Sequence, residues 1–167
     1  MSPVLETERL LLRPWRVSEA PIQRELWAER DPRVPPHRRI DEEGRPTVED
    51  FEEGIRAVQP STTELLAVER KVEGDVIGYC GLVAAGGPDE EPELAFELLR
   101  RVWGQGYATE AASAVLDWAR ASGHVRLSAT VWDWNHASRR VLAKLGFSET
   151  SREETEHGTN LLTRRDL

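Results

Sequence analysis

The chain has 167 residues, 39% of them hydrophobic and 31% charged, which is enough for one compact domain (residues 1–167) with a hydrophobic core and too short for two ordinary domains. No apolar run approaches the ~20 residues that a membrane helix needs, and charged residues interrupt the apolar start, so we expect neither a membrane span nor a secretory signal. The formal net charge of −8 argues against general nucleic-acid binding, which needs a basic face, and suits either a cationic acceptor or simply a soluble surface.

The first part of the chain predicts a strand, a helix and a loop. The run at 9–15 (RLLLRPW) is apolar enough for a strand. Ser18 is expected to cap a helix that extends to about Glu29. Four prolines between Pro32 and Pro46 interrupt regular structure, which predicts a loop.

A second helix and a β-hairpin should follow. Thr47 and Asp50 form an N-cap and acidic first-turn pattern for a helix over residues 48–58. Two β-rich runs, 64–70 and 76–83, are joined by a Glu-Gly-Asp turn, a pattern typical of a hairpin.

The middle of the chain predicts a loop, a two-faced strand and an amphipathic helix. Residues 84–92 are rich in glycine and proline, as a loop should be. In residues 93–99, acidic or small residues alternate with apolar ones, which is typical of a strand with two different faces. Residues 107–121 place apolar side chains on one stripe and charged ones opposite, which indicates a helix.

The C-terminal part predicts a strand over 125–132, a short helix closed by Gly146, and two strands around His157-Gly158. The resulting order is β-α-α-β-β-β-α-β-α-β-β. It predicts an α/β or α+β sheet protein without internal repeats.

A glycine-rich turn, Arg101 to Thr109, connects a predicted strand to a helix. Its glycines let a ligand approach the backbone, and the first helical turn offers unpaired N–H groups for an anionic phosphate. The alternative is that these glycines only form a tight turn before the helix. A P-loop is excluded because Gly106 is followed by Tyr107 where lysine is required. A dinucleotide fingerprint fails at Thr109, and the acidic residue it needs about 20 positions further on is missing from 124–132.

Asn135 and Ser138 form a second group of interest, at the start of the short helix. Asn135 is a good N-cap and Ser138 a tolerable first-turn residue, so both can be purely structural. The alternative is that both side chains face a cofactor that runs between two neighbouring strands.

The cysteine and the histidines indicate no redox or metal chemistry. Cys80 is the one cysteine, so no internal disulfide can form, and its apolar surroundings suggest a core residue and not a nucleophile. The four histidines are scattered singly without metal-ligand spacing, so no metal site is expected. A cytoplasmic location fits these features best.

Several motifs occur in a characteristic order. Arg101-x-x-Gly104-x-Gly106 precedes a helix, and Asn135-x-x-Ser138 is followed by Leu145-Gly146-Phe147. Further matching segments are Thr7-Glu8-Arg9-Leu10 to Pro14, Asp31-Pro32, Ile77 to Leu82 and Glu93 through Phe147. In this order and spacing, nearly the whole chain resembles the GNAT superfamily of acetyl-CoA-dependent N-acetyltransferases, and within it the Rim-type group that includes ribosomal-protein N-terminal acetyltransferases.

The resemblance implies a mixed, mostly antiparallel central sheet of about seven strands, with helices on both faces and a V-shaped splay between the strands at 93–99 and 125–132. Acetyl-CoA would be the co-substrate, its pantetheine arm lying in the splay like an added strand, with no metal. Backbone groups of Leu98 and Leu99 would hold that arm and polarise the thioester carbonyl. The other cofactor contacts are expected from Arg101, Gly104, Gln105, Gly106, Tyr107, Ala108 and Thr109 around the pyrophosphate, and from Asn135 and Ser138 along the pantetheine.

The mechanism implied is direct attack of the acceptor amine on the thioester, without an acyl-enzyme. A primary amine with a pKa near 10 is mostly protonated at neutral pH, so a carboxylate should help to remove its proton. Glu97 is the expected base, because it lies beside the reacting carbonyl on the less apolar face of its strand; an ion pair with a nearby arginine is the alternative. Many family members protonate the leaving thiolate with a tyrosine where this chain has Leu142, so Ser138 or Tyr107 would have to substitute.

Two other functions stay open. A GNAT-shaped domain that binds CoA without catalysis, as a sensor or assembly module, is favoured by the missing tyrosine, whereas a nicotinamide-dependent oxidoreductase fails at Thr109.

The amine acceptor, whether a protein N-terminus, an aminoglycoside, a polyamine or a small amine, is not indicated; its site is expected in residues 28–60 and 84–92. The resemblance is compatible with a homodimer, and neither nucleic acid nor a membrane is expected as a partner. Three tryptophans, Trp103, Trp132 and Trp134, either line the cofactor cleft or fill the core.

Overall fold

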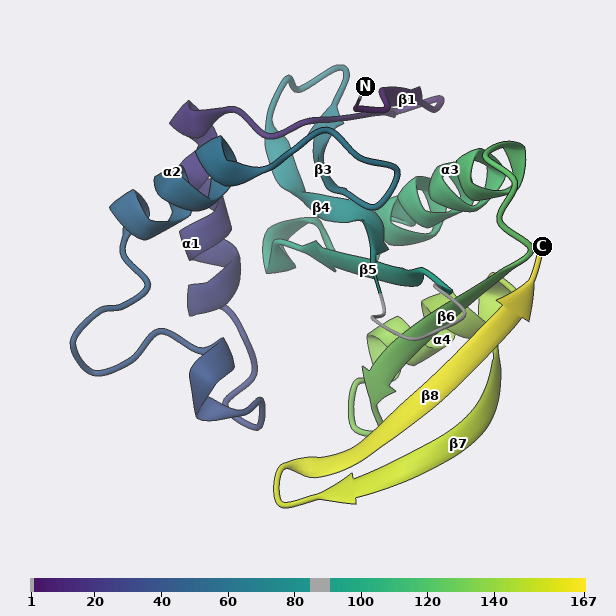
Figure 1. Ribbon diagram of the computed structural model, residues 1–167. Helices are drawn as coiled ribbons and strands as arrows, with labels where there is room; N and C mark the ends of the chain where they lie inside the picture. Colours follow the sequence, from purple (N-terminus) through teal and green to yellow (C-terminus); the bar gives the residue numbers. More distant parts are fainter. Residues whose placement is uncertain (1, 85–90) are drawn as a thin grey trace.

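One sheet contains all the strands found in the described residues, 2–84 and 91–167, of the computed structural model (Figure 1). Its strand order is β1-β2-β3-β4-β5-β6-β8-β7. The strands are β1 (Leu5–Glu6), β2 (Leu10–Arg13), β3 (Leu65–Arg70), β4 (Val76–Val83), β5 (Glu93–Leu98), β6 (Arg126–Trp132), β7 (Ser148–Thr155) and β8 (Gly158–Asp166). The α-helices are α1 (Ala20–Ala28), α2 (Val48–Ala57), α3 (Tyr107–Ala121) and α4 (His136–Lys144), with 3-10 turns at Val17–Glu19, Pro36–Arg38 and Arg100–Val102.

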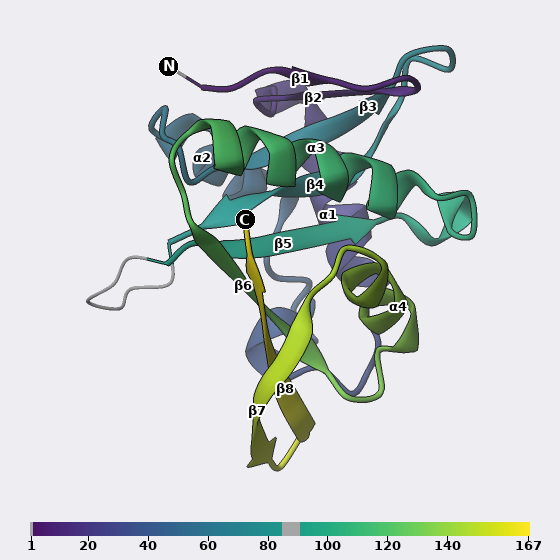
Figure 2. The ribbon, with the colours of Figure 1, turned by 90° about the vertical axis from the view of Figure 1, so that its right-hand side faces the viewer.

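Neighbouring strands are antiparallel except β5 and β6, which run parallel. These two pair at one position, Glu93 with Ser128, where Ser128 N–H donates to the Pro92 carbonyl at 3.1 Å. From there the two strands diverge toward their C-terminal ends, as Figure 2 shows. The mixed, mostly antiparallel sheet and the V-shaped splay predicted from the resemblance are therefore confirmed.

Helices cover both faces of the sheet (Figure 1). On one face α1 contacts α2 and β4; on the other, α3 contacts β4 and β5, and α4 contacts α3 and β6. The capping box predicted for α2 is present, since Thr47 Oγ1 accepts from Asp50 N–H at 3.2 Å and Asp50 Oδ2 accepts from Thr47 N–H at 2.8 Å. Because it uses the unpaired donors of the first turn, this cap explains why α2 begins at Val48.

The main core lies between the sheet and α3. Its fully buried members include Leu12, Leu66, Ile77 and Leu82 from the strands and Ala111, Val115 and Ala119 from α3. Leu94 and Leu98 of β5 belong to the same cluster. Because side chains alternate along a strand, Glu97 lies on the opposite face of the sheet, toward α1.

Backbone crowding at Gly78 fixes β4 against β5. A Cβ atom on Gly78 would lie 2.1 Å from the Glu97 carbonyl oxygen and 2.8 Å from Leu98 Cα, and the φ angle of Gly78 is +154°. Glycine is the residue that tolerates both the contact and the angle. The strand end that carries Glu97 and Leu98 is thereby held close to β4.

Two details differ from the predictions, and a third prediction is not tested by the described residues. β1, two residues long, adds a strand to the predicted set by pairing with β2. Ser18 does not cap α1: it lies within the 3-10 turn, and Glu19 is the residue before the helix, its carboxylate accepting from Arg16 N–H at 2.8 Å. The predicted loop at 84–92 falls mostly on residues 85–90, which lie outside the described residues.

Cys80 is fully buried, and burial raises the pKa of its thiol, which confirms the core residue predicted from the sequence. Among the described residues, none of the helices combines the length and the apolar character that crossing a membrane requires.

Candidate active site

The divergence of β5 from β6 leaves backbone groups of β5 without a partner strand. Leu99 N–H donates to the Ile77 carbonyl of β4 at 2.8 Å, and successive residues of an antiparallel strand direct their backbone groups to alternate sides. The N–H of Leu98 is therefore directed toward β6, which in the described chain pairs with β5 at Glu93 alone. An extended ligand can add to such an edge as a further strand does.

Other backbone groups at this strand end are already occupied. The Leu98 carbonyl accepts from Trp103 Nε1 at 2.8 Å, and the Leu99 carbonyl accepts from Val102 N–H at 3.1 Å. Of the Leu98 and Leu99 groups predicted to contact a cofactor, the Leu98 N–H is thus the donor left for a carbonyl in the splay. Trp103 packs over the strand end and is half exposed.

The glycine-rich turn forms the start of α3. Gly104 and Gly106 have φ angles of +77° and +82°, and Gly106 is the N-cap residue, without a side-chain cap. Glu110 N–H bonds to the Gly106 carbonyl at 3.1 Å, so the N–H groups of residues 107–109 precede the first intrahelical bond and point out of the helix end. These donors, together with the positive end of the helix dipole, suit a phosphate group.

Two side chains of this turn have partners away from the splay. Arg101 Nη1 lies 2.9 Å from Asp75 Oδ2, with about half of the arginine side chain exposed. Tyr107 is buried, with its ring 4.2 Å below the Arg9 guanidinium and 5.9 Å from that of Arg70. Tyr107 therefore offers its backbone N–H to the site, while its hydroxyl lies on the β2–β3 side.

α4 begins directly after the end of β6. Asn135 is its N-cap, with Oδ1 accepting from Ser138 N–H at 3.3 Å, so the structural role considered for Asn135 is present. Asn135 Nδ2 and Ser138 Oγ have no hydrogen-bond partner within 2–84 and 91–167, which leaves both for a ligand. Leu142 is 3% exposed and belongs to the core.

Glu97 forms the arginine ion pair that the sequence left open. Its carboxylate accepts from Arg30 Nε, at 3.0 Å and 3.4 Å for the two oxygens. Arg30 is itself held, because Nη1 donates to the Arg38 carbonyl at 2.9 Å and the guanidinium lies 4.2 Å over the Trp27 ring. The Arg30 side chain is 8% exposed, whereas 27% of the Glu97 side chain remains exposed.

The surroundings shift the protonation of two groups. Burial raises the pKa of Glu97, and the Arg30 guanidinium offsets part of that rise. Tyr79 lies opposite Glu97 on β4, and burial, followed by the Glu97 charge, raises the pKa of Tyr79 to about 12. A carboxylate with a raised pKa is a stronger proton acceptor, which is a property typical of a catalytic base.

Stacked side chains follow the C-terminal end of β6. The rings of Trp132 and Trp134 are parallel within 5°, with centroids 6.1 Å apart, and the Arg33 guanidinium lies 4.3 Å from the Trp134 ring. The segment after α1 thus contacts both sides of the splay, through Arg30 at Glu97 and through Arg33 at Trp134. It lies on the face of the sheet opposite α3 (Figure 1).

Comparison with known families identifies the fold. The sequence model described as "Acetyltransferase (GNAT) domain" matches residues 9–148. This chain belongs to the GNAT acetyltransferase family.

GNAT proteins with similar sequences or structures span nearly its whole length. The uncharacterized N-acetyltransferase YoaA of Bacillus subtilis is 27% identical over 157 residues, which cover 89% of this chain and 85% of YoaA. A GNAT-family acetyltransferase from Bacillus anthracis superposes with a TM-score of 0.80, 20% identity and 98% coverage of both chains. RimL, a ribosomal L7/L12 alpha-N-protein acetyltransferase solved in complex with coenzyme A, gives 0.82, 13% identity and coverage of 99% and 98%. At these identities the solved structures show a shared fold.

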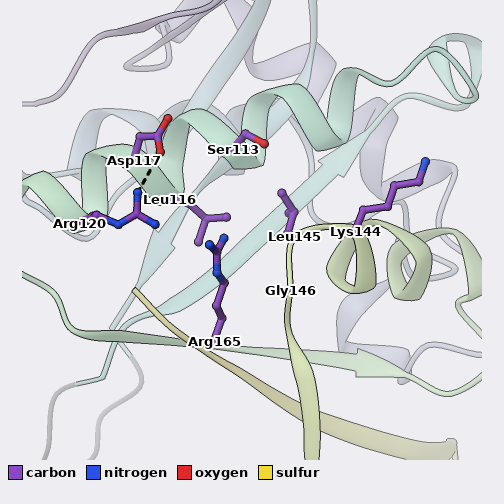
Figure 3. Close-up of a pocket in the computed structure, with 8 residues that line it drawn as sticks. All are labelled: Ser113, Leu116, Asp117, Arg120, Lys144, Leu145, Gly146 and Arg165. Atoms are coloured by element: carbon purple, nitrogen blue, oxygen red, sulfur yellow. Dashed lines mark hydrogen bonds and ion pairs between the residues drawn. The ribbon is translucent and has the colours of Figure 1, made fainter.

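A solvent-open pocket of about 440 Å³ lies apart from the GNAT glycine-rich turn. It is bounded by the second half of α3, the end of α4 and Arg165 of β8. Figure 3 shows Arg165 rising toward Leu116, Arg120 paired with Asp117, and Lys144 pointing away from this pair. None of its lining residues belongs to the predicted site.

Sequence reasoning missed three side chains at the GNAT splay: Arg30, Tyr79 and Arg33. Arg30 directly precedes Asp31-Pro32, and Tyr79 lies within the matching segment from Ile77 to Leu82. Both therefore lie in or next to a recognised motif and could have been considered as site residues. Their relation to Glu97 depends on how α1 and β4 pack. Arg33 carries no comparable signal, because its partner Trp134 is far away in the sequence.

Proposed function

We propose that this GNAT protein transfers an acetyl group from acetyl-CoA to a primary amine by direct attack within a ternary complex. The observation that carries this proposal is the unpaired end of β5, with the Leu98 N–H directed into the splay between β5 and β6. The glycine-rich start of α3 follows the end of β5 along the chain, after the 3-10 turn Arg100–Val102, and α3 packs on β5. A thioester arm and its phosphates can thus occupy adjoining sites.

Each part of the cofactor has a proposed set of contacts. The Leu98 N–H would donate to the thioester carbonyl at the end of β5, next to Leu99. The pyrophosphate would lie at the turn, with backbone contacts from Gly104, Gln105, Gly106, Tyr107, Ala108 and Thr109 and with Arg101 beside it. Asn135 Nδ2 and Ser138 Oγ would bond to the pantetheine amides from the start of α4.

Glu97 is the proposed base. The protonated amine first gives one proton to Glu97. The neutral nitrogen then bonds to the carbonyl carbon, the oxyanion is held by the Leu98 N–H, and the carbon–sulfur bond breaks to release CoA thiolate. As the amide forms, the nitrogen loses its second proton, which balances the proton that the thiolate takes up. Glu97 faces the acceptor side and keeps part of its side chain exposed, so it can take the proton directly or through a water molecule. Ser138 is the proposed donor to the leaving thiolate, which is a tolerable leaving group even without one because a thiol pKa lies near 8.5.

The acceptor is proposed to enter between the segment after α1 and the ends of β5 and β6. The RimL structure, whose protein acts on a ribosomal protein, makes a protein N-terminus the first acceptor class to test. Aminoglycosides, polyamines and small amines are the other classes. Residues 1–167 are proposed to act as one cytoplasmic unit, and a homodimer is a further proposal that size-exclusion chromatography with light scattering would test.

A second function, CoA binding without catalysis, is favoured by one observation. Leu142, buried in the core, stands where many GNAT enzymes carry the acidic tyrosine, so no hydroxyl is supplied from that position. A sensor or assembly module would need the cofactor contacts without a proton donor.

One experiment separates the two functions. The protein is incubated with acetyl-CoA labelled in the acetyl group and with a panel of N-terminal peptides, aminoglycosides, polyamines and small amines. Acetyl transfer predicts a labelled amide and one free CoA thiol for each amide formed, with loss of both in Glu97→Gln. Tight CoA binding without turnover on the whole panel would favour the binding module.

A further inference from the structure

The motif Thr7-Glu8-Arg9-Leu10 contacts the first turn of α3. Thr7 Oγ1 donates to Glu110 Oε2 at 2.5 Å, and Arg9 N–H donates to the same oxygen at 3.0 Å. Arg9 Nε donates to Glu110 Oε1 at 2.7 Å. Both carboxylate oxygens of Glu110 are therefore held from the connection between β1 and β2, about a hundred residues away in the sequence.

Arg9 also reaches the glycine-rich turn itself. Its Nη1 donates to the Gln105 carbonyl at 3.0 Å, and its guanidinium lies 4.2 Å over the Tyr107 ring. A Cβ atom on Gly106 would lie 3.5 Å from Arg9 Nη2. One guanidinium thus bonds to Gln105 in the turn and to Glu110 in the first turn of α3, and it covers the ring of Tyr107 between them.

We propose that Arg9 is a positioning residue for the pyrophosphate loop, a role that rests on the function proposed above. The peptide between Gln105 and Gly106 is planar and trans, so its carbonyl and its N–H point in opposite directions. By holding the Gln105 carbonyl, Arg9 directs the Gly106 N–H away from itself. The donor of Gly106 then joins those of residues 107–109 at the open end of α3.

Arg9 also compensates the charge of Glu110. Burial favours the protonated acid, but hydrogen bonds from Thr7 and Arg9 outweigh burial and lower the pKa of Glu110 below its usual value. Glu110 is therefore ionised at neutral pH, one turn from the proposed pyrophosphate. Without Arg9, this carboxylate would repel the ligand and the turn would lose its tether.

The test compares three probes that differ at the phosphates: CoA, 3′-dephospho-CoA and pantetheine. CoA and 3′-dephospho-CoA both contain the pyrophosphate, whereas pantetheine ends before it. Dissociation constants for all three are measured by NMR titration, which also reports weak binding. The proteins are wild type, Arg9→Met, and Arg126→Met as the matched control, because Arg126 forms an ion pair of the same 2.7 Å length with Asp166 on the far side of the sheet.

Arg9→Met is expected to raise the dissociation constants of CoA and 3′-dephospho-CoA alike, by about tenfold or more, because charge-assisted hydrogen bonds are lost. Pantetheine binding should change by less than about twofold, and Arg126→Met should bind all three probes as wild type does. A general loss of structure would weaken pantetheine as well, so this split between probes is specific to the loop. Equal CoA affinity in wild type and Arg9→Met, or an equal loss for all three probes, would overturn the role of Arg9.

A folding check on Arg9→Met and the binding of the probes to wild type decide how the result is interpreted. If thermal unfolding shows that Arg9→Met is not folded, Arg9→Lys takes its place; it keeps the charge, but a single ammonium cannot bridge Glu110 and Gln105 as a guanidinium fork does, so the same split between probes is expected. Wild-type protein that binds none of the three probes would contradict the proposed function itself. Wild-type binding that Arg9→Met and Arg9→Lys both retain would remove the positioning role alone.

Discussion

Glu97 accepts a hydrogen bond of 3.0 Å from Arg30 Nε, so the proposed base shares its carboxylate with a nearly buried guanidinium. Burial raises the pKa of this carboxyl, and Arg30 works against the rise. A carboxylate with a raised pKa accepts a proton more readily than an exposed glutamate does. Arg30, fixed in turn by the Arg38 carbonyl and the Trp27 ring, also sets the direction of the carboxylate.

Replacing Glu97 by glutamine should slow acetyl transfer by about 10²–10⁴-fold while leaving the affinity for CoA nearly unchanged. Glutamine keeps the shape and one acceptor oxygen but takes no proton. At pH 7 an amine with a pKa near 10 is neutral in only about one part in a thousand, so the loss should be largest there and smaller at higher pH. The measurement is a pH–rate profile at saturating acetyl-CoA.

The matched control for this substitution is Glu93→Gln, on the same strand and the same face. Glu93 accepts from Thr130 N–H at 3.1 Å and lies at the closed end of the splay, so its loss should change turnover little. Equal turnover of wild type and Glu97→Gln from about pH 6.5 to 9 would remove Glu97 from the proton transfer.

Gly106→Glu should abolish CoA binding, because it places bulk and a negative charge where the proposed pyrophosphate approaches the backbone. Gly123→Glu is the control: Gly123 follows α3, has a similar φ angle of +91°, and has open space around it. Both variants carry the same backbone strain and the same added charge. Calorimetry with CoA on the two folded variants should therefore show a loss for position 106 alone, and retained binding in Gly106→Glu would mean that the turn has no ligand role.

Gly78→Ala should destabilise the protein by more than about 3 kcal/mol, or prevent folding, because the added methyl group meets backbone atoms that cannot move aside. Gly54→Ala, in the exposed middle of α2 with no atom within 4 Å of its Cβ position, should instead stabilise by roughly 0.5–1 kcal/mol. Urea unfolding measures both changes. A neutral Gly78→Ala would show that β4 and β5 do not approach as closely as described.

Glu19→Gln should reduce stability at neutral pH and matter less in acid. Burial works to raise the pKa of Glu19, but hydrogen bonds from Arg13 and from Arg16 N–H outweigh it and hold the pKa below its ordinary value of 4.5. A folded-state pKa below the unfolded value stabilises the fold above about pH 4.5, and this contribution is lost as the pH falls through the folded-state pKa.

The expected loss for Glu19→Gln at pH 7 is about 1–3 kcal/mol, the range for hydrogen bonds to charged groups. Urea unfolding of wild type and variant between pH 7 and pH 3 measures it. A difference that stays constant over this range would show that the carboxylate charge is not what stabilises the turn before α1.

Local patterns predicted the elements that have strong periodicity or a defined cap. The helix at 107–121 was predicted with the bounds that α3 has, because a long apolar stripe follows two glycines. The Thr47 cap needs four residues of sequence and no tertiary contact. β1 was not predicted, because two residues show no periodicity. Ser18 was predicted to cap α1, but it lies inside the 3-10 turn. Glu19 is the N-cap residue of α1 without a side-chain cap bond, and its carboxylate accepts from Arg16 N–H in front of that turn.

The sequence predicted which backbone segments line the candidate site, but not which side chains contact one another there. The glycines, Leu98 and Asn135 lie on short contiguous motifs, so their places along the splay follow from the family resemblance. The Arg30 contact with Glu97 joins residues 67 positions apart, and the Arg9 contact with Glu110 joins residues 101 apart. The chain has many arginines and glutamates that could pair, and the tertiary packing determines which of them do.

Calorimetric titration tests whether the splay and the turn before α3 bind acetyl-CoA, as proposed. Acetyl-CoA, NAD and ATP are titrated separately into wild-type protein at one ionic strength. We expect saturable binding of acetyl-CoA with one molecule per chain and no comparable heat from NAD or ATP. Binding of NAD or ATP without any heat from acetyl-CoA would contradict the proposal.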